Sequence, residues 1–197
     1  MNKKTLTYIS LVVGCLACLV GIFYVVETIM ELTSFSSMYE SKHNIYIAVI
    51  GILFAVAAVG FILCAIKLLL PFIKKEESKG SDVVLPMLVY FAYETIINFV
   101  AMCFYGFNNS KCWVMVIFGA VGLVITILAA LNKFDAKIKN VILLVAGVLG
   151  FTLAIIGLVN AGGVSIATYI FTMLLFIAIC AFYLVALLID NEKSSNK

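Results

Sequence analysis

A stripe of polar side chains interrupts an apolar segment near the middle of the chain. Tyr90, Glu94 and Asn98 follow one another at intervals of four residues, which places them on one face of an α-helix. A charged carboxylate at the centre of a membrane costs about 2.5–3.5 kcal/mol on insertion scales, and exclusion of water favours its uncharged form. We therefore expect the stripe to face the interior of a helix bundle.

Two interpretations of this stripe remain open at the level of the sequence. In the first, Glu94 relays protons or forms, with Tyr90 and Asn98, the polar wall of a cavity for a solute. In the second, Glu94 is a neutral acid that joins helices through a hydrogen bond to Asn98 or to a neighbouring helix. Such bonds contribute only about 0.6 kcal/mol on average within membranes, which is little to justify a buried acid.

No other group of residues has the spacing of a catalytic, metal or cofactor site. The chain has none of the hydrolase, zinc-protease, Walker or dinucleotide patterns. Its aspartates, Asp82, Asp135 and Asp190, lie in or beside polar segments, and His43 is the single histidine. All basic residues are lysines, so the planar fork with which arginine reads phosphates and bases is missing. We expect no enzymatic activity, no metal, no cofactor and no nucleic-acid partner.

The elements that must hold the stripe are apolar helices. Of the 197 residues, 65% are hydrophobic and 12% are charged, whereas soluble domains have about 25% charged residues. The apolar runs reach the roughly 20 residues that a membrane-crossing helix needs, and they lack the alternation of barrel strands. We predict an all-α, polytopic membrane helix bundle that forms one domain over residues 1–197. The expected helices cover about residues 6–30, 45–73, 83–107, 112–131, 141–159 and 166–189.

The distribution of lysine predicts the orientation of this bundle. If the N-terminus is cytoplasmic, eleven of the thirteen lysines lie at the cytoplasmic side, and only Lys42 and Lys111 lie outside. An excess of lysine in short cytoplasmic loops is the usual bias of membrane proteins. We expect both termini in the cytoplasm, in a plasma membrane and, from the residue usage, a bacterial one.

Two pairs of residues are then expected near the outer surface. Glu27 and Glu31 stand one helical turn apart, and we interpret them as part of a solvated acidic rim, with cation gathering as the alternative. Cys103 and Cys112 end one expected helix and begin the next, so they could form a disulfide in an oxidising compartment.

Small residues recur at helical spacing in the fourth and fifth expected helices. Gly119 and Gly122 mark one face of the fourth, and Gly150 and Ala154 mark one face of the fifth. Small residues let two helices approach closely and gain dispersion. We predict that these faces pack the two helices against each other, or form the face of an oligomer.

Two functions fit these features. The first is a non-enzymatic structural, assembly or stress-related component of the membrane, favoured by short loops and few buried polar groups. The second is a small-solute transporter, or the substrate-binding subunit of one, in which the stripe lines the path. The expected partners are the lipid bilayer and either further copies of this chain or other membrane subunits.

Overall fold

The computed structural model describes residues 3–34, 41–74, 80–131 and 134–195, and it is helical throughout its regular elements. A short 3₁₀ helix, η2 (Gly80–Val83), precedes the third of six long helices. The long helices are α1 (Lys3–Ser34), α2 (Ser41–Ile73), α3 (Val84–Tyr105), α4 (Ser110–Ala130), α5 (Ala136–Asn160) and α6 (Ser165–Ser195).

All six helices are long and apolar enough to cross a membrane, which confirms the predicted number and type of elements. Most of them extend beyond the apolar runs from which they were predicted. Helix α1 begins at Lys3 and α6 continues to Ser195, because lysine, serine and threonine at a helix end can remain helical where water or headgroups solvate them. Pro71 lies within the last turn of α2, two residues before its end at Ile73.

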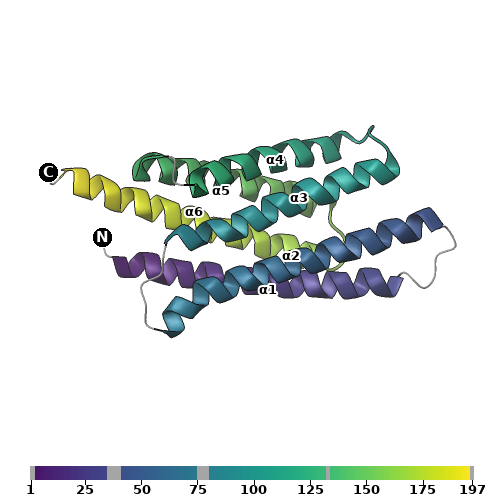
Figure 1. The fold of residues 1–197 in the computed structure, drawn as a ribbon, viewed down its shortest axis with the longest axis horizontal. Coiled ribbons are helices and arrows are strands. Elements are labelled where there is room, and N and C mark those ends of the chain that lie inside the picture. Colours follow the sequence, from purple (N-terminus) through teal and green to yellow (C-terminus); the bar gives the residue numbers. More distant parts are fainter. Residues whose placement is uncertain (1–2, 35–40, 75–79, 132–133, 196–197) are drawn as a thin grey trace.

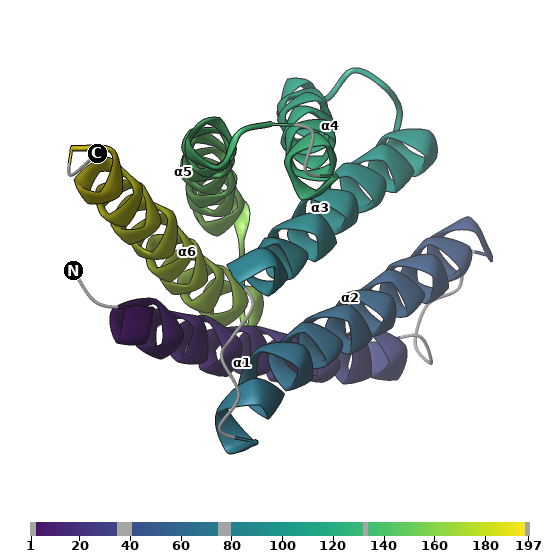
Figure 2. The same ribbon diagram turned by 60° about the vertical axis from the view of Figure 1, so that its left-hand side comes forward.

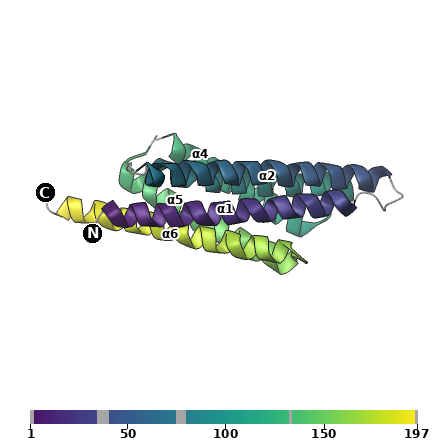
Figure 3. The same cartoon turned by 90° about the horizontal axis from the view of Figure 1, so that it is seen from below.

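The helices run up and down and close into a ring (Figures 1 and 2). Each helix contacts the next one in the chain, and α6 returns to contact α1. Short connections force consecutive helices to be antiparallel neighbours, and an even number of them brings the start of α1 and the end of α6 to the same end of the bundle. Figure 3 shows α1 between α2 and α6 along its length. We call the end of the bundle that holds the start of α1 and the end of α6 the terminal end, and the opposite end the distal end.

Large side chains fill the interior of the ring while the outward faces stay apolar. Tyr24, Phe61, Tyr90, Phe91 and Phe176 are all fully buried. Exposed isoleucine, leucine, valine or phenylalanine side chains occur on every one of the six helices. Soluble proteins rarely expose such large apolar areas, whereas lipid solvates them without cost.

The glycine faces contact different helices from the ones predicted. A Cβ atom added to Gly122 would overlap the ring of Phe91 on α3, and one added to Gly150 would overlap the ring of Phe176 on α6. Gly119 likewise faces α3, at Thr95, and Ala154 is fully buried. The three glycines therefore accommodate side chains from α3 and α6, and not from each other's helices. Spacing shows which face is small, but it does not show which helix covers that face.

Candidate functional site

Glu94 lies at the centre of the candidate site. It is the eleventh of the 22 residues of α3, and its exposed fraction is 0%. Asn98, one turn later, donates from Nδ2 to the backbone carbonyl of Glu94 at 2.9 Å and to its Oε2 at 3.1 Å. The stripe thus faces the interior of the ring. Glu94 and Asn98 are hydrogen-bonded to each other, as their spacing of four residues on one helix predicted.

The second carboxyl oxygen of Glu94 is poorly satisfied. The hydroxyl groups of Tyr90 on α3 and Tyr169 on α6 both face this carboxyl group and interact with it. The geometry of these contacts is poor at two atoms. Neither Glu94 Oε1 nor the Tyr90 hydroxyl oxygen has a well-formed hydrogen bond. Two polar atoms with no exposure to solvent are therefore available to a further ligand or proton.

A second buried carboxyl group, Glu27 on α1, belongs to the same site. Only 4% of this residue is exposed. The prediction that Glu27 belongs to a solvated acidic rim is therefore wrong. The Thr168 hydroxyl on α6 donates to Glu27 Oε1 at 2.6 Å, and the Ser165 side chain also hydrogen-bonds to this carboxyl group. Glu31, one turn further, is half-buried.

The spacing of apolar residues in α1 predicts that Glu27 is buried, although its charge suggested exposure to solvent. The buried residues of α1 are spaced alternately by four and three positions, and Glu27 continues that series. The series is Val13, Ala17, Val20, Tyr24 and Glu27. Such spacing marks the seam along which one helix packs against others, so the position of Glu27 on the seam predicts burial.

Aromatic rings from three helices pack against one another beside the two acids. Tyr24 on α1 lies with its ring centroid 4.9 Å from that of Tyr93 on α3 and 5.6 Å from that of Phe61 on α2. Phe54 on α2 completes the group at 5.9 Å from both tyrosines. Because the faces of aromatic rings are electronegative, they attract cations as well as exclude water.

We name the polar residues of this site the carboxyl–tyrosine cluster. It joins two carboxyl groups, four tyrosines, an amide and a threonine from α1, α3 and α6. The members are Tyr24, Glu27, Tyr90, Tyr93, Glu94, Asn98, Thr168 and Tyr169.

The cluster extends from the middle of the bundle toward the distal end. Thr168 is the fourth residue of α6, which puts its contact with Glu27 about 5 Å along the axis from the start of that helix. Glu94 lies about 15 Å from the start of α3 at the terminal end. The polar groups therefore reach from near one surface to mid-depth.

The charged groups that act on the two acids of the cluster are other carboxyl groups, Glu31 on Glu27 and Glu27 on Glu94. The lysines of α1 and of the described part of α6 are confined to positions 3, 4 and 193 at the terminal end, and α3 has none. Lys67 on α2 lies 4.0 Å from Asp82 instead. The charged group that acts on Glu94 is Glu27, so the two acids repel each other when both are ionised.

The cysteines considered for a disulfide are free thiols in the structure. Cys103 is exposed near the end of α3, and Cys112 is half-buried in the first turn of α4. Their thiols are not part of the carboxyl–tyrosine cluster.

We expect Thr168→Val to destabilise the protein through the loss of its bond to Glu27. The size of the effect is about 0.6 kcal/mol and at most about 1.7 kcal/mol, the range of such bonds within membranes. Thr152→Val is the matched control, because the Thr152 hydroxyl on exposed α5 surface donates only to its own helix, at Val148 O. Unfolding in detergent measures both, and equal effects would contradict the pairing of Thr168 with Glu27.

Comparison of the chain with protein-family models, with curated proteins and with solved structures finds no match. The case for a function therefore depends on the geometry of the cluster.

Proposed function

We propose that this chain is a multi-pass protein of a cell membrane with both termini in the cytoplasm. Six helices of sufficient length and apolar character support the membrane location. The distribution of lysine in the sequence supports the orientation, since eleven of the thirteen lysines fall in segments that this orientation assigns to the cytoplasm.

This orientation predicts which positions a membrane-impermeant thiol reagent reaches in intact cells. On a cysteine-free background, single cysteines at Ser110 and Gly163 should react from outside, because both are exposed at the distal end. A single cysteine at Ala136, which is exposed at the terminal end, should react only after the cells are opened. Reaction at Ala136 in intact cells would overturn the orientation. Ser36 and Ser78, the corresponding positions in the first two loops, lie outside the described residues.

We propose further that the protein binds a small monovalent cation in the carboxyl–tyrosine cluster, as a small-solute transporter or a transporter subunit. The observation that carries this proposal is the presence of two buried acids, Glu27 and Glu94, in one site where the charged groups that act on them are other carboxyl groups. Ionisable residues within membranes are costly and usually mark paths of ions, protons or substrates.

A bound cation would let the two acids be charged, whereas a purely structural role requires them to be neutral. Hydrogen bonds within membranes contribute about 0.6 kcal/mol on average, while each charged acid costs several times as much. A bound cation offsets that cost by pairing with the carboxylates. The rings of Tyr24, Tyr93 and Phe61 can add cation–π attraction. Carboxyl, phenol and amide groups suit such binding, and so we propose no enzymatic step.

Thermal unfolding in detergent tests this role directly. A ligand that binds only the folded state raises its stability by about 2.7 kcal/mol at one hundred times its dissociation constant. NaCl or methylammonium chloride should therefore raise the melting temperature, with the bulky N-methylglucamine chloride keeping the ionic strength constant. A melting temperature that is independent of both cations would overturn the proposal.

A structural or assembly role is the second candidate, and the dense packing of the interior favours it. Tyr24, Tyr90, Phe61 and Phe176 are fully buried and fill the space between the helices. In that case Glu94 is a neutral acid held by Asn98, and cations have no effect on unfolding.

A further inference from the structure

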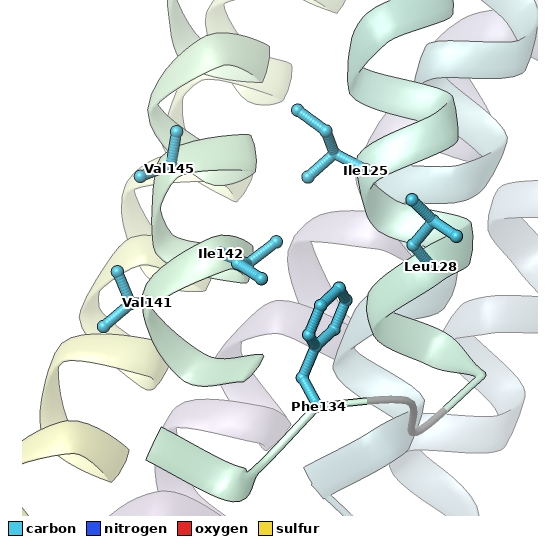
Figure 4. A pocket seen from close by; sticks show the side chains of 6 residues that line it. All are labelled: Ile125, Leu128, Phe134, Val141, Ile142 and Val145. Carbon is cyan, nitrogen blue, oxygen red and sulfur yellow. The ribbon is translucent and has the colours of Figure 1, made fainter. Parts of the chain in front are cut away.

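An apolar cavity lies between α4 and α5 near the terminal end, away from the carboxyl–tyrosine cluster. Its volume is about 250 Å³. Six apolar side chains line it: Ile125, Leu128, Phe134, Val141, Ile142 and Val145. In Figure 4 the Phe134 ring rises from the connection between the two helices, with Ile125 and Leu128 on one side and Ile142 on the other. Several of these side chains are exposed on the outer surface, so the cavity is accessible from the surroundings of the bundle.

A lysine lies one helical turn before Val141, a residue that lines this cavity. Lys137, Val141 and Val145 follow one another at intervals of four residues on α5, so they share one face of that helix. Lys137 is exposed in the first turn, about 6 Å along the axis from Val141. An apolar cavity with a cation one turn above it matches the two parts of an anionic phospholipid, the acyl chain and the headgroup phosphate.

We propose that the α4–α5 cavity binds the acyl chain of an anionic phospholipid whose headgroup pairs with Lys137. The proposal rests on the membrane location given above and is independent of the cation site. Charge supports it: among the described residues, the first turn of α5 holds Lys137 and Lys139 against Asp135 just before it, a net charge of +1 (two minus one). The amide groups at the start of α5 add positive potential at the same depth.

Replacement of Asp135 offers a test in which the binding of an anionic lipid should become stronger. This exposed carboxylate precedes α5, and its side chain makes no capping hydrogen bond to the helix. It opposes an anionic headgroup near Lys137, and its removal costs no hydrogen bond to the helix. Asp135→Asn should therefore strengthen the binding of an anionic lipid, while Lys137→Gln should weaken it.

Native mass spectrometry of the full chain, with phosphatidylglycerol or phosphatidylcholine added at equal amounts, tests the proposal. The wild type should retain phosphatidylglycerol in preference, and Lys137→Gln should reduce that preference about fivefold, the effect of one lysine at a charged membrane surface. Lys4→Gln is the matched control, because Lys4 is an exposed lysine of α1 at the same end of the bundle. Asp135→Asn should raise the preference.

A variant of the cavity separates the acyl chain from the headgroup. Val145→Trp fills the cavity and leaves Lys137 in place, so it should reduce the retention of both lipids. Wild-type retention in Val145→Trp, an unchanged preference in Lys137→Gln, or an equal loss in Lys4→Gln would each overturn the proposal. A wild-type chain that retains neither lipid would also overturn the proposal, and the thiol-labelling experiment tests the membrane location separately.

Discussion

Glu94→Gln should remove all cation-dependent stabilisation and leave the protein folded. Glutamine has nearly the size of glutamate, and its carbonyl oxygen can still accept from Asn98 Nδ2, which donates to Glu94 Oε2 at 3.1 Å in the structure. It cannot carry the negative charge that pairs with a cation. A wild-type gain of about 2.7 kcal/mol at saturating cation should therefore fall to zero, as measured by thermal unfolding in detergent across a cation titration.

Three further variants serve as comparisons for Glu94→Gln. Glu31→Gln is the matched control, since it makes the same change of charge at a half-buried acid beyond the cluster, and it should keep the cation response. Tyr90→Phe removes a hydroxyl group that has no well-formed partner, so it should cost little stability. Glu94→Leu should cost about 0.5–2 kcal/mol, toward the lower limit, because Asn98 retains its bond to the backbone carbonyl of Glu94.

The pattern across these variants decides between the two functions. Loss of the cation response in Glu94→Gln but not in Glu31→Gln supports a binding site. If the wild type responds to cations and Glu94→Gln responds equally, the ligand lies elsewhere and the carboxyl–tyrosine cluster is not its site. A neutral Glu94→Gln together with an unresponsive wild type supports the structural role.

Gly150→Leu should destabilise the bundle, and more strongly than Gly147→Leu. Even a Cβ atom at this position would overlap the ring of Phe176, which is fully buried and has no free space into which to move. Insertion of extra carbon atoms into a packed core costs about 1–3 kcal/mol, and leucine adds four. The melting temperature in detergent, or the yield of folded protein where the loss is complete, measures the effect.

A graded series with alanine separates this clash from a general effect of glycine replacement. Gly150→Ala should destabilise most. Gly147→Ala should follow, because its Cβ atom would lie 2.8 Å from Cys180 Sγ, a smaller neighbour. Gly51→Ala should be tolerated, since its nearest neighbour is Leu32 Cδ2 at 3.3 Å. Phe176→Leu should partly restore Gly150→Ala, and a failure of that rescue would show that the ring is not the obstacle.

Local patterns predicted those parts of the structure that depend on few distant contacts. The helices follow from apolar runs that must satisfy their own backbone hydrogen bonds in lipid. The contact between Glu94 and Asn98 follows from an interval of four residues within one helix. Both predictions need only the pitch of a helix and the cost of a buried charge.

The remainder of the site depends on contacts between residues far apart in the chain. Glu27 and Thr168 are separated by 141 positions, and no local spacing predicts the hydrogen bond between them. For the same reason the small faces of α4 and α5 could be recognised while their partners, Phe91 and Phe176, could not. The pairing of Glu27 with Thr168 comes from the closure of the ring by α6 against α1.

That closure has a consequence in time as well as in space. Helix α6 is the last to be synthesised, and it supplies Thr168, Ser165 and Tyr169 to acids on helices made earlier. Since nascent chains emerge from the N-terminus onward, Glu27 and Glu94 are synthesised before these partners exist, and in the proposed membrane location they would enter the bilayer without them. During that interval the growing chain holds two incompletely paired acids, so a chaperone or insertase that shields them would act between the emergence of α3 and the arrival of α6.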